Sequence, residues 1–231
     1  MQRPGSIWIL LMALVPAAVL ASCAGGSEKA QTVSEGQQAA TPPARVTVAR
    51  WDGVAGADGY TRLALDAVRR NGSALVSNVP EDVSRYCPGY EKANADDRAS
   101  FWVGLLSALA KWESNFKPAV TFTEPDIYDA SGNNVISRGL LQLSFESANA
   151  YGCGLRTADD LHDPGTNLTC GVKILSRLVT RSGVIASDGR PWRGAAAYWS
   201  PFRDQAKRAD IQSWTSRQSY CSQVVAGEGA L

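Results

Sequence analysis

The sequence has little histidine and little net charge. One of its 231 residues is histidine, and 23 Lys and Arg side chains are balanced by 22 Asp and Glu. No run of five like charges occurs, so electrostatic capture of nucleic acid is excluded as a main mode of binding. The five cysteines include no Cys-x-x-Cys pair, which together with the single histidine argues against zinc. We therefore expect no nucleic-acid partner, no metal and no cofactor.

A hydrophobic run long enough to cross a membrane is also missing. The most apolar stretch, residues 7–20, has about 14 residues, whereas a transmembrane helix needs roughly 20. With Arg3 before it, this stretch is typical of a signal peptide. Small residues stand directly before Cys23, an arrangement that resembles the lipobox of bacterial lipoproteins. An ordinary signal peptide cut nearby and an uncleaved anchor are the alternatives.

The lipobox resemblance implies a signal peptide over residues 1–22, cleavage before Cys23 and lipidation of the Cys23 thiol. Ala24 then favours the outer membrane, so we expect an exported, periplasmic protein anchored there by lipid. Residues 23–45 contain almost no large apolar side chain and predict a flexible tether. Residues 46–231 have no further break or repeat and predict one domain, which we expect to be monomeric.

Four cysteines remain once Cys23 is assigned to the lipid. An even number of cysteines in an exported chain predicts disulfides, although four cysteines allow three pairings. We favour Cys153 with Cys170, which closes a short loop. The remaining pair, Cys87 with Cys221, ties the end of the chain to an early segment.

Helix signals dominate the predicted domain. Asn94 is a helix N-cap, and apolar residues follow at helical spacing until Pro118 forbids continuation. Asp163 and Pro164 predict the start of another helix, and Gly183 predicts its end. Shorter helices are expected over residues 60–76, 144–151, 192–198 and 203–214. Residues 120–136 carry β-forming side chains around a turn-rich segment, which predicts a short hairpin or a long loop. The fold class is therefore mainly α (α+β).

Glu113 is the first candidate for chemistry. It stands near the end of the helix that begins after Asn94, and it follows Trp112. The negative end of the helix dipole and the neighbouring aromatic rings both disfavour its ionised form, so it is a candidate general acid. The alternative is a solvated carboxylate paired with Lys111 or Lys117.

Four motifs in order resemble the lytic transglycosylases of the soluble-lytic-transglycosylase and goose-lysozyme type. The first is Glu113-Ser114, and the second is Gly139-Leu140-Leu141-Gln142, with Leu141 where Met is commoner. The others are Asn167-Leu168 with Gly171, and Ala196-Ala197-Tyr198. Together they cover about residues 100–200. The resemblance implies a lysozyme-like helical domain that acts on peptidoglycan strands.

The resemblance also implies the role of each matching residue. Glu113 is the acid/base that cleaves the β-1,4 bond between N-acetylmuramic acid and N-acetylglucosamine, and the 6-hydroxyl of the muramic acid is the nucleophile that forms a 1,6-anhydro end. Ser114 orients Glu113 by a hydrogen bond. Gly139 lets the backbone approach the glycan, Gln142 binds sugar groups, and Tyr198 steadies Glu113 or the intermediate.

Two departures from the family pattern keep other functions open. Trp199 follows Tyr198 where Asn is usual, so it either stacks on a sugar ring or is a buried structural residue. The segment between the first two motifs is long and contains Glu124, Asp126 and Asp129. One of these carboxylates can serve as a base for water, which would make the enzyme a muramidase. A third alternative is a non-catalytic peptidoglycan-binding lipoprotein.

Overall fold

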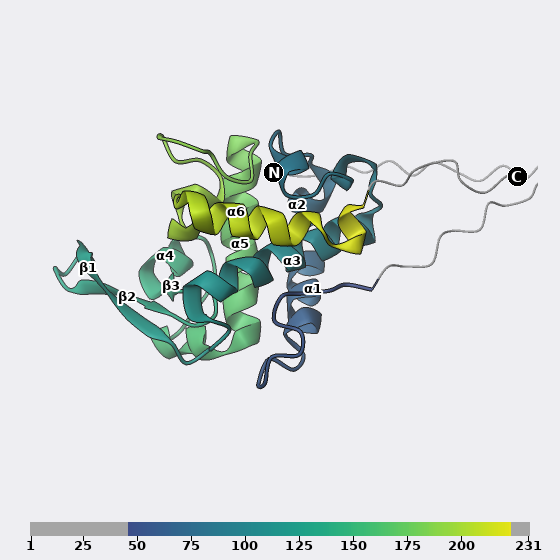
Figure 1. Ribbon diagram of the computed structural model, residues 1–231. Coiled ribbons are helices and arrows are strands. Elements are labelled where there is room, and N and C mark those ends of the chain that lie inside the picture. The colour runs from purple at the N-terminus through teal and green to yellow at the C-terminus, as the bar shows by residue number, and fades with distance from the viewer. Residues whose placement is uncertain (1–45, 223–231) are drawn as a thin grey trace, which may run out of the picture. The chain divides into compact units, whose positions relative to one another are not determined.

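The computed structural model describes residues 46–222 (Figure 1). The predicted signal peptide, Cys23 and the predicted tether lie outside the described residues. Within residues 46–222, no helix combines the length and the apolar character needed to span a bilayer.

Six α-helices and three strands, together with six short 3-10 helices, make up the regular structure of residues 46–222. The helices are α1 (Tyr60–Asn71), α2 (Ser73–Ser77), α3 (Ala95–Ser114), α4 (Phe145–Ala150), α5 (Pro164–Ser182) and α6 (Gln205–Ser216). The strands are β1 (Thr121–Tyr128), β2 (Asn134–Arg138) and β3 (Leu143–Ser144), antiparallel in the order β1-β2-β3. The predicted class, mainly α with a small hairpin, is confirmed, and β3 adds a strand that we did not predict.

Helix α3 runs through the core. Its N-cap is Asn94, whose side chain accepts a hydrogen bond from the Asp97 amide at 2.9 Å, as predicted. Residues 99–110 are buried without interruption, and α1, α2 and α6 pack around them. The helix ends at Asn115, where φ is 49°, ahead of Pro118. Beyond this buried stretch the last turn is partly exposed, and that turn carries Glu113.

Helix α5 packs against α1 and α2. Its start is the predicted one, since the Asp163 side chain accepts the Thr166 amide at 2.8 Å and Pro164 is the first helical residue. Its predicted end is also found, at Gly183 with φ of 73°. Near its start, the fully buried Asn167 faces the loop between β2 and β3.

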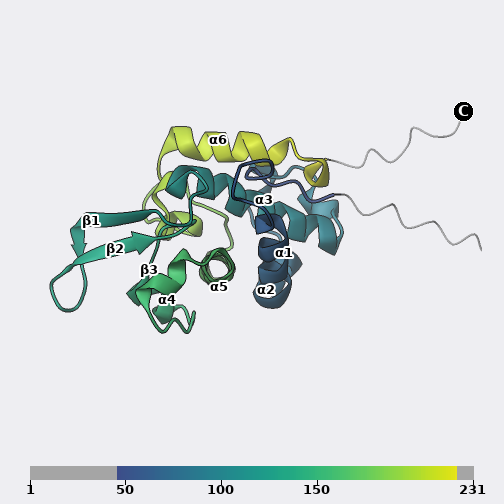
Figure 2. The ribbon, with the colours of Figure 1, turned by 90° about the horizontal axis from the view of Figure 1, so that it is seen from below.

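Strands β1 and β2 form a hairpin that projects away from the helices (Figure 2). We call this hairpin, residues 121–138, the arm. The pairing is regular from Thr121 with Arg138 to Thr123 with Ile136, and resumes at Tyr128 with Asn134. Four residues of β1 therefore face one residue of β2, which is a large bulge.

Both expected cysteine pairs are disulfide bonds in the structure. Cys87–Cys221 joins positions 134 residues apart, and Cys153–Cys170 joins positions 17 apart. The first ties the segment before α3 to the segment after α6. The second attaches the loop after α4 to α5.

Two predicted helices are wrong. Residues 60–76 form two helices because the chain breaks at Gly72, where a Cβ atom would lie 2.8 Å from the Val68 carbonyl oxygen. Residues 192–198 contain only the 3-10 turn Ala195–Ala197. There the chain is held by backbone pairing instead, since Gly194 forms a β-bridge with Ala186 and the Ala195 amide donates to the Ile185 carbonyl at 2.7 Å.

Candidate active site

A cleft lies between the last turn of α3, the arm, the start of α4 and the turn around residue 198. Its volume is about 590 Å³, which is in the range of ligand sites. Cavities of similar volume lie beside Cys153–Cys170 and between α1, α2 and α3, but Glu113, whose pKa is raised by burial, lines neither of them. The chemistry of the lining therefore selects this cleft. Its ionisable and polar residues are Glu113, Glu124, Tyr128, Asp129, Ser137, Gln142, Ser144, Glu146, Ser147, Tyr198, Ser200 and Arg203.

Glu113 is held in the cleft by the last turn of α3 and is partly buried. Burial raises the pKa of its carboxyl group to about 8, although Lys207 lowers it, and the Glu124 carboxylate adds a smaller raising effect. Within the described residues Glu113 forms no ion pair with Lys111, which lies 3.8 Å from Asp210 Oδ2 instead. A carboxyl group with this pKa is mostly protonated at neutral pH and can act as a general acid.

The three candidate second carboxylates have different surroundings. Glu124 lines the cleft and accepts a hydrogen bond from Ser137 Oγ at 2.8 Å. Asp126 is exposed and is not part of the cleft lining. Asp129 lines the cleft but caps the turn of the arm, where it accepts the Ser131 and Asn133 amides at 2.8 Å and 2.9 Å. These bonds, the Asn133 one above all, lower the pKa of Asp129. Of these three carboxylates, Glu124 is therefore the one best placed to act on a ligand near Glu113.

Ser114 does not hydrogen-bond Glu113, so the role expected from the family resemblance is corrected. Its hydroxyl donates to the Leu140 carbonyl at 2.9 Å, with the Ala110 carbonyl at 3.3 Å as a second acceptor. It thereby fastens the end of α3 to residues 139–142, which we call the motif loop. Ser114 fixes the position of Glu113 through the backbone.

Gly139 is closely packed against other parts of the protein, and its expected contact with a glycan stays a prediction. A Cβ atom at Gly139 would overlap the Leu161 carbonyl oxygen and the Asn167 side-chain amide, and φ is 78°. Asn167 holds the motif loop by accepting the Leu141 amide at 3.0 Å and donating to the Arg138 carbonyl at 3.1 Å. The Leu141 side chain is fully buried against Gly171 and has no access to a ligand.

Of the two roles considered for Trp199, stacking on a sugar ring or a buried structural role, the structure shows the buried one. Its exposed fraction is 2%, and its indole N–H donates to the Leu141 carbonyl at 2.9 Å. The Tyr198 ring contacts the Trp199 ring, with centroids 4.7 Å apart. The Tyr198 hydroxyl is paired with Ser147 Oγ at 2.9 Å, so this turn is fastened to α4.

Gln142 leaves one polar atom without a partner. Its side-chain N–H groups donate to the Gly139 carbonyl at 2.9 Å and the Val120 carbonyl at 3.1 Å, while Oε1 is buried and unpaired among the described residues. Its φ of 46° is a strained conformation for a residue with a side chain. An unpaired buried acceptor on a strained residue that lines a cleft indicates a ligand-binding position.

Residues 92–220 match the family model of the Transglycosylase SLT domain. The chain belongs to this SLT transglycosylase family. Among solved structures it is similar to "Bd0314 DslA wild-type form 2", with 42% identity, a TM-score of 0.72, and coverage of 77% of this chain and 100% of that chain. Two DslA forms with one Glu-to-Gln substitution each match at 41% identity, with the same score and coverage. No curated protein matches the chain.

Membership of the SLT family gives the domain its lysozyme-like fold and a lytic-transglycosylase-like action on peptidoglycan. The SLT cleft also contains residues that we did not predict. Arg203 donates from Nε to the Ala196 carbonyl at 2.7 Å and from Nη2 to the Tyr198 carbonyl at 3.0 Å, which holds the turn beside Glu113. Arg203 lies outside the four motifs, so no motif pointed to it. No group of three His, Cys, Asp or Glu side chains in residues 46–222 is arranged to hold a metal ion.

Proposed function

We propose that this SLT protein cleaves the β-1,4 bond between N-acetylmuramic acid and N-acetylglucosamine in peptidoglycan, with Glu113 as the acid. One observation carries the proposal: a carboxyl group with a pKa of about 8 lies in the cleft of an SLT domain. At neutral pH the protonated form can give its proton to the glycosidic oxygen while the bond from that oxygen to C1 of the muramic acid breaks.

In the leading route the second step uses the same carboxyl group. The 6-hydroxyl oxygen of the muramic acid attacks C1, and its proton passes to the Glu113 carboxylate, which regenerates the acid. The product is a 1,6-anhydromuramic end. Because the nucleophile belongs to the substrate, the reaction gains from proximity and needs no second carboxylate. The unpaired Gln142 Oε1 supports the route as an acceptor for an amide N–H or hydroxyl of the sugar.

Glu124 favours a second candidate function, that of a muramidase. It shares the cleft with Glu113, and its charge raises the pKa of Glu113, so the two carboxyl groups lie close together. The two glutamates replaced in the DslA forms lie 11 positions apart in that protein, and Glu113 and Glu124 are also 11 apart. In this route Glu124 takes a proton from water, and the water oxygen attacks C1.

Mass spectrometry of the muropeptides released from purified sacculi tests these routes. The wild-type protein should release anhydro ends by the first route, which are lighter by one water than the reducing ends of the second. Glu113→Gln should abolish release by either route while the circular dichroism spectrum is unchanged. Glu124→Gln should remove only reducing ends. Binding to sacculi without any release by the wild type would favour a non-catalytic binding protein.

We also propose that the protein is exported and held by lipid on Cys23 at the outer membrane. The support is the lipobox resemblance, together with two disulfides, which form in oxidising compartments. In cells supplied with a labelled fatty acid, the wild-type protein should carry the label and Cys23→Ser should not. Equal labelling of the two would contradict the anchor.

A further inference from the structure

The arm exposes large apolar side chains. Phe122, Ile127 and Tyr128 are 53%, 55% and 61% exposed, and they are three of the six large hydrophobic side chains exposed among residues 46–222. Ile127 and Tyr128 also line the cleft that holds Glu113, whereas Phe122 does not. Apolar surface that is exposed and continues into a ligand cleft indicates a binding surface.

The bulge of β1 explains how the side chains of Ile127 and Tyr128 come to line the cleft. Residues 124–127 oppose only Val135, and the side-chain amide of Asn134 donates to the Glu124 carbonyl at 2.7 Å and to the Pro125 carbonyl at 3.0 Å. The extra residues are therefore held by side-chain bonds in place of the missing backbone pairs. Because a bulge changes which side of a strand the following residues face, it can bring Ile127 and Tyr128 to the cleft side together with Glu124.

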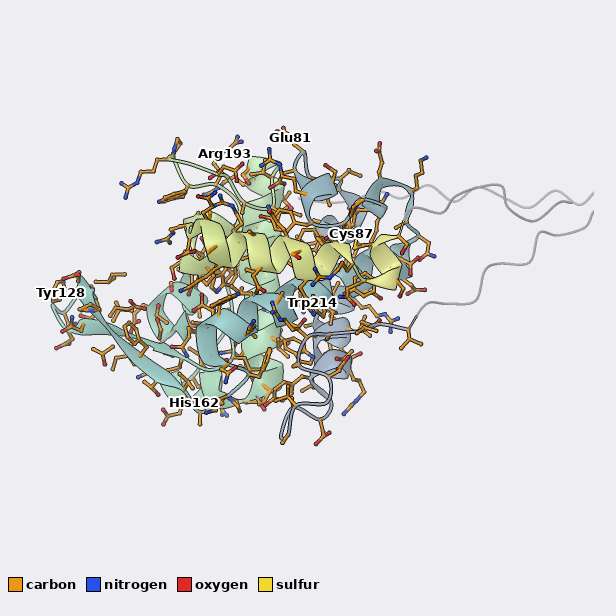
Figure 3. All side chains as sticks on the ribbon, viewed as in Figure 1. Glu81, Cys87, Tyr128, His162, Arg193 and Trp214 are labelled. Carbon is orange, nitrogen blue, oxygen red and sulfur yellow. A yellow bond between two sulfur atoms is a disulfide. The ribbon has the colours of Figure 1, made fainter. Side chains whose placement is uncertain are left out.

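Tyr128 sits at the outer end of the arm (Figure 3). It is the last residue of β1, between the bulge and the turn that Asp129 caps, so both of its backbone neighbours are fixed. Its hydroxyl lies 3.4 Å from the Pro125 carbonyl, a long contact that leaves the ring exposed. The ring is thus presented to the cleft on a supported backbone.

The surroundings of the ring decide which ligand it fits. Glu124, Asp126 and Asp129 lie within five positions of Tyr128, and this negative charge opposes insertion into a membrane, whose surface attracts Lys and Arg. The cleft itself is lined by hydroxyl, amide and carboxyl groups, which suit a polyhydroxylated ligand. A sugar ring has polar edges and an apolar C–H face, and an exposed aromatic ring is the partner for such a face.

We propose that Tyr128, with Ile127 beside it, forms an outer subsite that stacks on a sugar ring of the glycan strand, beyond the two rings whose bond is cleaved. The inference rests on the proposed function for the identity of the ligand. It adds a binding position on the arm that none of the four family motifs contains.

Binding of peptide-free glycan strands tests the subsite without cleavage, if all variants are made on Glu113→Gln. Tyr128→Ala should weaken binding about fivefold to tenfold, the range of a lost aromatic contact. Tyr128→Phe keeps the ring and should restore most of the affinity. Phe122→Ala is the matched control, an equally exposed ring on the same strand outside the cleft, and should bind like its parent.

Two outcomes in the comparison of the variants would overturn the subsite. The first is unchanged binding by Tyr128→Ala, and the second is an equal loss from Phe122→Ala. Thermal unfolding of each variant checks the fold, because an exposed ring should be removed with little loss of stability. Failure of the proposed function is seen separately, as wild-type protein that releases nothing from sacculi. If strands do not bind to the Glu113→Gln protein at all, the subsite is also contradicted.

Discussion

The motif loop and the arm meet at the same cleft but are built in opposite ways. Each contains a glycine with positive φ, 78° at Gly139 and 83° at Gly132, and each is held by an asparagine side chain, Asn167 and Asn134. In the motif loop an added Cβ atom would overlap two groups, whereas at Gly132 no atom lies within 4 Å. A glycine with positive φ and an asparagine side chain therefore occur in both regions. In the motif loop they belong to a tightly packed support, and in the arm they belong to an exposed surface.

This difference separates the residues that hold the chemistry from those that perform it. Most of the residues that carry the family resemblance in the motif loop are buried and bonded to other parts of the protein. The arm is exposed, and its side chains are available to a ligand. Mutations of the loop should therefore reduce stability, and mutations of the arm should reduce binding or change the chemistry.

The largest expected effect is that of Gly139→Ala. Strain at positive φ and overlap with Leu161 and Asn167 should lower the free energy of unfolding by about 3 to 4 kcal/mol. Gly132→Ala also places a side chain at positive φ, but the added Cβ atom meets no neighbouring atom. It should lower the free energy of unfolding by about 1 kcal/mol. Urea unfolding followed by tryptophan fluorescence measures both. Equal losses would remove the distinction between the two regions.

Replacing Asn167 and Asn134 in turn should give the next largest difference in stability. Asn167→Ala removes a fully buried side chain and leaves the Leu141 amide and two carbonyls without their partner, which should cost about 3 kcal/mol. Asn134→Ala releases the bulge at the surface and should cost less than about 1 kcal/mol. It should instead reduce strand binding, because Tyr128 is no longer held. A stability loss from Asn134→Ala as large as that from Asn167→Ala would contradict this assignment.

The pH dependence of stability should have opposite signs at Glu113 and Asp129. The pKa of Glu113 is raised from 4.5 to about 8, so the folded state binds a proton that the unfolded state releases, and wild-type stability falls as pH rises between these values. The free energy of unfolding of Glu113→Gln, relative to that of the wild type, should therefore rise by about 2 to 3 kcal/mol between pH 4.5 and pH 7.

The pKa of Asp129 is lowered, so its stabilising effect is present above its unfolded pKa and is lost as pH falls through the folded value. Asp129→Asn should consequently be less stable than the wild type at neutral pH and approach it in acid. Denaturant unfolding at a series of pH values measures both variants. The same sign for the two would contradict the environments described for these carboxyl groups.

The smallest expected effect is on the pKa of Glu113 itself. Glu124→Gln removes a like charge, so the pKa of Glu113 should fall, though it should stay above its ordinary value because burial is the main cause. Asp126→Asn, a change on the same strand outside the cleft, should leave it where it is. Titration of isotope-labelled glutamate by NMR reports both. An unchanged pKa in Glu124→Gln would place the two carboxyl groups too far apart to act as a pair.

The sequence was sufficient for features that depend on local signals. The Asn94 cap, the Asp163-Pro164 start and the Gly183 end are side-chain or backbone preferences within one turn, and all three are found. The class was predictable as well, because helical spacing was frequent and β-forming residues were confined to one segment. The helix expected over residues 192–198 was wrong because Gly194 pairs with Ala186. This pairing joins separate segments, so local sequence signals do not reveal it.

The site was predictable in its residue types but less so in its contacts. Glu113 could be found from its motif, yet the partner of Ser114 is the Leu140 carbonyl, 26 positions away, and nothing near Ser114 in the sequence indicates it. Pro125 inside β1 was a signal for an irregular strand. The size of the bulge, and hence the direction of Ile127 and Tyr128, depends on bonds from Asn134 that pairing alone creates.

The described chain begins and ends at nearly the same place. Tyr220 donates its hydroxyl hydrogen to the Val48 carbonyl at 2.9 Å, and Arg50 pairs with Asp210 of α6 at 2.6 Å. Figures 1 and 2 both show this place on the side of the helices away from the arm. A label attached at residue 46 or at residue 222 therefore lies on the side of the domain opposite the arm, and it leaves the arm open to a ligand.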